Sequence, residues 1–188
     1  MTRYQKRLLT QAQILLADGK VIECSDILAE MAGKRKKRPR IEASTSQIRS
    51  KDFDFVANFD GGAPESQRAN HGRIGVVIVD KHGELVQEIG ADIHAQVVTS
   101  NYAEHSSAAV ALHELARIAK RGDTVLLQGD SKLVVQQLCK RWKAKGGAYI
   151  EAYKRSSAAL EHLHRMGVHV TIRWIPRELN EAADALCA

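Results

Sequence analysis

From residue 53 onward, apolar side chains recur at every second position: Phe53, Phe55, Ala57 and Phe59. A period of two is typical of a β-strand with one buried face. The run ends on a carboxylate, Asp60, followed by two glycines that break a strand. A buried strand with an acid at its tip raises the question of whether other acids in the chain meet it there.

Two further strands are predicted directly after the first. Residues 74–80 form a second apolar run, the tight turn KHG follows, and residues 84–96 return as the other arm of a hairpin. Beyond them the spacing of apolar residues alternates between that of helices and that of strands. We expect helices at 102–120, 131–139, 148–166 and 181–187, and strands at 124–128 and 168–175. This order predicts an α/β fold with a five-stranded mixed sheet, in which three antiparallel strands are extended by parallel strands added through helices.

The composition excludes several classes of protein. Of the 188 residues, 44% are hydrophobic and 27% are charged, which are ordinary values for one globular domain with an appendage. No run of about 18 apolar residues occurs, so no membrane partner is expected. Cys24, Cys139 and Cys187 are scattered without a CxxC pattern, which favours a reducing compartment, the cytoplasm. The net charge of +6 favours polyanionic partners such as nucleic acid.

The first 51 residues differ from the rest of the chain. Residues 1–33 are predicted to form a helical hairpin of unknown role, either the front half of a DNA-reading helix-turn-helix or a hairpin that docks a protein or dimerises. Residues 34–51 are predicted to be a basic linker, since six of the seven residues from Lys34 to Arg40 are Lys or Arg. Such a run contacts phosphates, serves as a localisation signal, or acts only as a solubilising tether. Residues 52–188 are the predicted main domain.

Four acids fall where this fold would bring them together. Asp60 and Asp130 follow the first and fourth strands, which can be parallel neighbours whose carboxyl ends share one edge of the sheet. Glu104 starts a core-facing stripe that continues through Ala108 and Leu112, so it faces the sheet. Asp184 lies in an alanine-rich terminal segment that looks packed against the fold.

Each acid also has a simpler interpretation. Asp60 could be a turn residue, Glu104 could favour the helix dipole, Asp130 could cap the following helix, and Asp184 could be solvated. If all four share one rim, they repel one another and raise one another's pKa values unless cations neutralise them. Ligands that offer only oxygen select hard ions, Mg²⁺ or Mn²⁺.

The segments FDGGA, SNYAEHSSAAVALHEL, LLQGDSKLVVQQL and WIPRELNEAADALC, taken in this order, resemble type 1 ribonuclease H. The resemblance covers about three quarters of the chain, from residue 53 onward. It implies the ribonuclease H fold, with helices on both faces of the sheet, and hydrolysis of the RNA strand of an RNA–DNA hybrid by two Mg²⁺ ions. It also implies roles for the acids: Asp60 bridges both ions, Asp184 helps to hold the ion that activates water, and Glu104 and Asp130 hold the ion at the leaving oxygen.

The same resemblance implies substrate contacts. Gly61 and Gly62 belong to the first motif, and Asn101 and Asn180 match positions that approach the substrate, with helix capping as the alternative for both. Arg177 stands where many members carry histidine and could meet a phosphate. Trp142 and Lys143 lie in a small basic patch, with helix-end packing as the alternative for the tryptophan.

Two departures from the family pattern keep other functions open. The loop at 63–73 lacks the Asn-Pro-Gly turn of the family, so the same fold could act on another polynucleotide. A catalytically idle domain that binds nucleic acid is the other alternative. The presence of all four acids favours a metal-dependent endonuclease.

Overall fold

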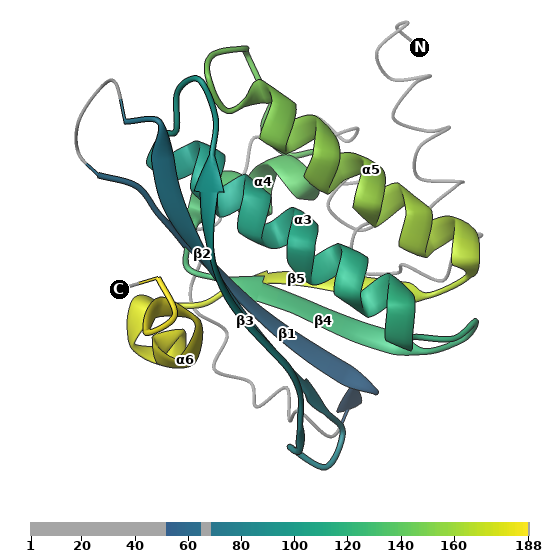
Figure 1. Cartoon of the computed structure of the whole chain (residues 1–188). Helices are drawn as coiled ribbons and strands as arrows, with labels where there is room; N and C mark the ends of the chain where they lie inside the picture. The colour runs from purple at the N-terminus through teal and green to yellow at the C-terminus, as the bar shows by residue number, and fades with distance from the viewer. Residues whose placement is uncertain (1–51, 65–68, 188) are drawn as a thin grey trace, which may run out of the picture. The chain divides into compact units, whose positions relative to one another are not determined.

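The computed structural model describes residues 52–64 and 69–187 (Figure 1). The predicted hairpin at 1–33 and the linker at 34–51 lie outside these residues. The strands are β1 Phe55–Gly62, β2 His71–Asp80, β3 Leu85–His94, β4 Thr124–Gly129 and β5 His169–Trp174. The helices are α3 Ser100–Ile118, α4 Lys132–Leu138, α5 Ile150–Met166, the short 3-10 helix η2 Arg177–Leu179, and α6 Glu181–Asp184.

The strands form one mixed sheet in the order β3-β2-β1-β4-β5. β1 pairs antiparallel with β2, and β2 pairs antiparallel with β3. β1 and β4 pair in parallel, as do β4 and β5. The predicted fold class is therefore confirmed, and β1 and β4 are the central parallel neighbours that the sequence led us to expect.

Helices lie on both faces of the sheet (Figure 1). A side chain at Gly61 of β1 would meet the backbone of α3 at Ala103, whereas one at Gly75 of β2 would meet α6 at Ala183. Gly61 and Gly75 are offset by one position in the β1–β2 register, so they face opposite sides of the sheet. α3 thus covers one face and α6 the other.

The main core lies between the sheet and α3, α4 and α5. Phe59 and Leu127 from the sheet and Leu112, Leu115 and Leu163 from the helices are fully buried there. The stripe that the sequence predicts along the first long helix is confirmed, because its alanines and leucines all lie in this core. The same stripe carries Glu104 to the edge of the core.

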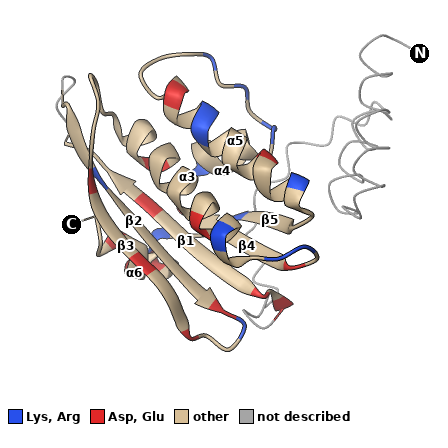
Figure 2. Ribbon diagram, turned by 45° about the vertical axis from the view of Figure 1, so that its right-hand side comes forward, with Lys and Arg blue, Asp and Glu red and all other residues tan. Residues whose placement is uncertain are grey.

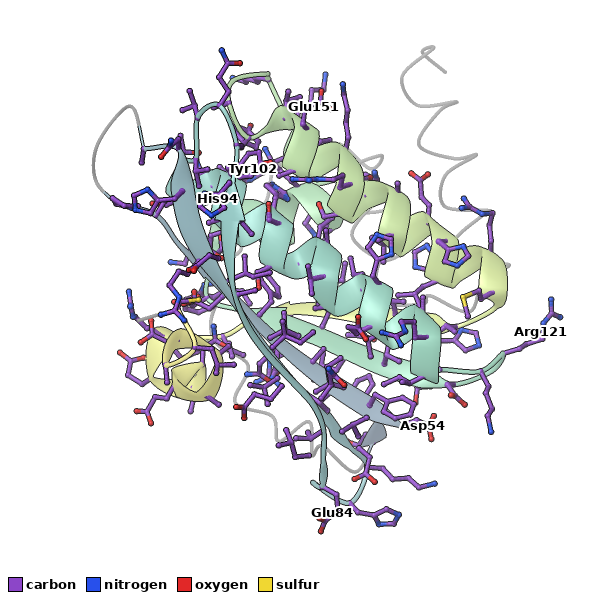
Figure 3. All side chains as sticks on the ribbon, in the orientation of Figure 1. Asp54, Glu84, His94, Tyr102, Arg121 and Glu151 are labelled. Atoms are coloured by element: carbon purple, nitrogen blue, oxygen red, sulfur yellow. The ribbon has the colours of Figure 1, made fainter. Side chains whose placement is uncertain are left out.

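Buried polar contacts hold α3 to the neighbouring helices. The His105 side chain is fully buried, with Nε2 2.8 Å from Oε1 of Gln137 on α4 and Nδ1 3.0 Å from Oγ of Ser156 on α5. Burial lowers the pKa of His105, so the ring is neutral. At the start of α3, the Tyr102 hydroxyl accepts a hydrogen bond of 2.8 Å from Arg155, and Figure 3 shows the tyrosine between its own helix and α5.

The far end of the central strand pair is fixed by Asp54. Its carboxylate accepts hydrogen bonds from the backbone N–H (2.9 Å) and the hydroxyl (3.1 Å) of Thr124, at the first residue of β4 (Figure 3). These bonds hold the pKa of Asp54 below its usual range. They tie the residue before β1 to the start of β4, at the end of the strand pair opposite to Asp60 and Asp130.

Some predicted boundaries are wrong. β1 begins at Phe55 and continues two residues beyond Asp60, because Gly61 and Gly62 still pair with β2. The β2 strand begins at His71, before the apolar run at 74–80, because His71 and Gly72 pair with β3. α3 begins at Ser100, and its cap is the Thr99 hydroxyl, which accepts from the Tyr102 N–H at 3.2 Å.

The terminal helix and the segment before it also differ from expectation. α6 ends at Asp184 as a single helical turn, and three residues of turn follow it. The preceding 3-10 helix at Arg177–Leu179 is too short to show a periodic pattern, so the sequence does not predict it. Over the part of the chain that the structure describes, no helix has both the length and the apolar character needed to cross a membrane.

Candidate active site

Three of the four predicted acids converge at one edge of the sheet. Asp60 comes from β1, Glu104 from the first turns of α3 and Asp130 from the residue after β4, and each offers a carboxylate oxygen within 4.8 Å of the others. Since β1 and β4 are parallel neighbours, their carboxyl ends deliver two of the acids side by side. We call Asp60, Glu104 and Asp130 the acidic cluster.

Gly61 lets α3 approach the sheet closely enough to complete this cluster. An ideal Cβ at Gly61 would lie 2.3 Å from the carbonyl carbon of Ala103 and 2.4 Å from the backbone N of Glu104. Real Cβ atoms do not tolerate such distances from backbone, so only glycine fits here. The close approach of strand and helix places Glu104 beside Asp60.

The cluster is electrostatically strained. Burial, followed by the charges of Asp60 and Asp130, raises the pKa of Glu104 to about 9. Burial and the charge of Asp130 also raise the pKa of Asp60. Within the described residues, Oε2 of Glu104 is the one buried side-chain polar atom that lacks a hydrogen-bond partner. A buried, unpaired carboxylate oxygen facing two further carboxylates fits a divalent cation that prefers oxygen ligands.

The fourth acid, Asp184, lies outside the acidic cluster and is paired with Arg177. Its charge still contributes to the raised pKa of Asp60, so it is close to the site. The Arg177 side chain is 73% exposed, and its positive charge acts against the rise in the pKa of Glu104. This guanidinium therefore offsets part of the repulsion among the acids.

Asn180, which the sequence predicts to approach the substrate, and Cys187, which the sequence does not assign to the site, both contact the acidic cluster. The amide of Asn180 is fully buried and donates to the carbonyl of Phe59 (3.0 Å) and to Oδ1 of Asp130 (3.3 Å). The thiol of Cys187 donates a hydrogen bond to Asp60, and burial with the charge of Asp60 raises the pKa of the thiol to about 12. Both residues follow the 3-10 turn that brings the end of the chain back to β1, which the sequence pattern does not encode.

The backbone of Asp130 is held separately from its carboxylate. The indole N–H of Trp174, the last residue of β5, donates to the carbonyl of Asp130 at 2.8 Å. Asp130 therefore does not cap the following helix, whose N-cap residue is Ser131. Its carboxylate, which accepts the hydrogen bond from Asn180, faces the other acids.

The remaining predicted substrate-binding residues lie at different depths. Gly61 is packed against α3, and Gly62 has space around it, since an added Cβ would be 3.8 Å from the carbonyl oxygen of Cys187. Asn101 is exposed in the first turn of α3. Trp142 is 49% exposed and Lys143 is exposed, both on the segment between α4 and α5, where Figure 2 shows basic residues along the loop.

A five-stranded mixed sheet with helices on both faces and acids from its two central strands defines a ribonuclease H-like domain. Comparison with known proteins agrees. A profile described as reverse transcriptase-like matches residues 58–188, and the chain belongs to this family.

The similar structures include ribonucleases H1. The enzyme from the archaeon Halobacterium salinarum NRC-1 is 33% identical, with a TM-score of 0.57, over 70% of this chain and 92% of that one. LC11-RNase H1, whose structure was solved in complex with an RNA/DNA hybrid, is 29% identical, with a TM-score of 0.58, over 70% of this chain and 92% of that one.

A longer bacterial protein is also similar. The bifunctional protein Rv2228c of Mycobacterium tuberculosis is 31% identical over 134 residues, which are 70% of this chain and 34% of the relative. The chain thus spans about a third of the length of that relative. The structure of its N-terminal RNase H domain is 25% identical, with a TM-score of 0.59, and covers 72% of this chain and 91% of that one.

Proposed function

We propose that the chain is a metal-dependent endonuclease that hydrolyses the RNA strand of RNA–DNA hybrids. The observation that carries the proposal is the acidic cluster: three carboxylates from three separate segments offer oxygens within 4.8 Å of one another, and one oxygen of Glu104 is buried without a hydrogen-bond partner. Carboxylates this close repel one another, which brings no benefit to a domain that only binds nucleic acid. A cation site, in contrast, needs clustered carboxylates as ligands.

The ions that fit best are Mg²⁺ and, as the alternative, Mn²⁺, because the donors are all carboxylates. Asp60, Glu104 and Asp130 would hold these ions. Asp184 would become a further ligand once its ion pair with Arg177 is broken. Two such ions, when bound, supply a clamp on the attacking and leaving oxygens of a phosphodiester. The chain itself holds Asp130 through Trp174 and Asn180, and Glu104 through the packing of α3 on Gly61.

Contacts with the hybrid would come from the exposed residues around the cluster. Arg177 is exposed beside the acids and carries a permanent charge suited to phosphate. Trp142 and Lys143 present a ring and a charge on the loop between α4 and α5, and Asn101 an amide at the start of α3. The complex of LC11-RNase H1 with an RNA/DNA hybrid supports this choice of substrate. The scattered cysteines of this chain favour the cytoplasm as the location of the protein.

The proposal is tested by offering RNA–DNA hybrid, duplex DNA and duplex RNA to the full chain, with Mg²⁺ and with chelator. We expect Mg²⁺-dependent cleavage of the RNA strand of the hybrid alone. Asp130→Asn should lower kcat by a factor on the order of 10² or more, because an ion ligand loses its charge. Asp92→Asn is the control, since that exposed side chain on β3 lies outside the acidic cluster.

Three results would contradict the proposal. Cleavage that survives Asp130→Asn would exclude the acidic cluster as the catalytic site. Preference for duplex DNA or duplex RNA would assign the fold to another substrate. Binding of the hybrid without cleavage of any substrate would favour the idle domain.

A further inference from the structure

Three amide side chains form a chain of hydrogen bonds on the sheet face that carries α6. Nε2 of Gln128 on β4 donates to Oδ1 of Asn58 on β1 at 3.2 Å. Nδ2 of Asn58 donates to Oδ1 of Asn180 at 3.1 Å, and Nδ2 of Asn180 donates to Oδ1 of Asp130 at 3.3 Å. We call Gln128, Asn58 and Asn180 the amide ladder; it ends on a carboxylate of the acidic cluster.

The sheet itself brings the first two members together. Asn58 and Gln128 are register partners in the parallel pair of β1 and β4, so their side chains project from the same face. Both are half-buried, whereas Asn180, at the junction of η2 and α6, is fully buried. The ladder therefore links the centre of the sheet to the tip of β4 and to the residue before α6.

The ladder has one preferred direction, which its last member imposes. The Nδ2 group of Asn180 faces two acceptors, the Phe59 carbonyl and the Asp130 carboxylate. A flipped Asn180 amide would place its oxygen against both, with repulsion in place of two hydrogen bonds. Asn58 supplies the complementary donor to the other end of that amide, and Gln128 orients Asn58 in the same way.

We infer that Asn58 and Gln128 are positioning residues, which act through Asn180 to hold the Asp130 carboxylate toward Asp60 and Glu104. Neither has a place in the acidic cluster, and both act on the site only through the ladder. The inference rests on the proposed function, because it gives the cluster a supporting framework suited to ion binding.

Asn58→Leu, Gln128→Leu and the double variant test the inference in the full chain. Leucine keeps the branched shape of asparagine and removes its donor and acceptor. Thr124→Val is the matched control, because it removes a hydrogen bond of 3.1 Å between the segments of the same two strands at their other end. Three quantities are measured: the melting temperature, the affinity for Mn²⁺ by calorimetry, and kcat and KM on the hybrid.

We expect Asn58→Leu to lower kcat and Mn²⁺ affinity by about tenfold each, at the lower end of the range for residues that support metal ligands, with KM within about twofold. Gln128→Leu should have a smaller effect, since it acts one step further away. The double variant should match Asn58→Leu, because both changes act through the one amide of Asn180. Thr124→Val should lower the melting temperature alone.

The inference is overturned if Asn58→Leu changes kcat and Mn²⁺ affinity no more than Thr124→Val does at a similar melting temperature. It is also overturned if the wild-type chain binds no Mn²⁺, which would remove the proposed function with it. If the wild type binds Mn²⁺ but cleaves no substrate, only the proposed function fails, and the Mn²⁺ affinities still decide the role of the ladder.

Discussion

At the scale of single residues, the most unusual side chain is Glu104. Burial first, and then the charges of Asp60 and Asp130, raise its pKa from 4.5 to about 9. Without a bound cation the carboxyl group therefore holds a proton at neutral pH. An ion that takes Glu104 as a ligand must displace this proton, so ion binding and pH are linked.

This link predicts a pH dependence of stability for the ion-free protein. Between about pH 4.5 and about pH 9 the folded state binds more protons at Glu104 than the unfolded state, so this residue's contribution to stability falls as pH rises. The slope is at most about 1.4 kcal/mol per pH unit. The measurement is denaturant unfolding in chelator, and Glu104→Gln should lack this component. An identical pH profile for both proteins would show that the raised pKa is absent.

The residues that can be predicted are those governed by local rules. Asp60 and Asp130 are predictable because acids at the ends of parallel neighbouring strands meet at one edge, and Glu104 because a helical stripe faces the core. Asn180 and Cys187 cannot be placed in the same way. Their contacts depend on how the chain turns back to β1 after β5, which leaves no periodic signature.

At the scale of elements, two glycines decide how closely helices approach the sheet. Gly61 admits α3 on one face, and Gly75 admits α6 on the other, where an added Cβ would lie 2.1 Å from the Ala183 carbonyl oxygen. The obstructing atoms are backbone, which cannot rotate away. The distance between each helix and β1 or β2 is therefore fixed by the absence of a side chain.

Gly61→Ala is expected to push α3 away from β1 and to separate Glu104 from Asp60. Overpacking of this kind costs about 1–3 kcal/mol in unfolding free energy, and the loss of kcat should exceed what the remaining folded fraction explains. Gly90→Ala on β3 is the control, because its nearest neighbour would lie at an ordinary 3.4 Å. Unfolding curves and kcat are measured for both, and equal effects of the two changes would refute the special role of Gly61.

The order of the elements is predictable because hydrophobic period separates strands from helices. The boundaries of the elements are harder to predict, since pairing with β2 extends β1 through Gly62 and pairing with β3 extends β2 back to His71. The 3-10 turn η2 is missed and the single turn of α6 is overextended, because their conformation follows from tertiary contacts. Local propensity carries little information in segments this short.

At the scale of the whole molecule, the chain carries a net charge of +6, although acidic residues are concentrated at the site. Six basic residues lie in the seven-residue run from Lys34 to Arg40, in the predicted linker. A basic run attached to a domain that handles nucleic acid raises affinity through release of counterions, independent of sequence.

Replacing the six basic residues of this run with glutamine should weaken hybrid binding most at low salt and make its salt dependence shallower, by about 0.7–0.9 in the log–log slope for each phosphate that is no longer neutralised. The rate at saturating hybrid should remain, since the acidic cluster is unchanged. Binding is measured by titration at several salt concentrations, with Lys120→Gln and Arg121→Gln as controls before β4. An unchanged salt slope would count against the linker as a phosphate-binding segment.

The hydrogen bond from the Cys187 thiol to Asp60 has a consequence for chemical labelling. With a pKa of about 12, the sulfur carries almost no thiolate at neutral pH and reacts slowly with alkylating agents. Burial is the main cause of this raised pKa, and the charge of Asp60 adds to it. A cation on Asp60 would neutralise that charge and would compete for the oxygen that the thiol contacts. The reactivity of Cys187 would then rise with ion occupancy, so that alkylation of this thiol would report ion binding at the acidic cluster.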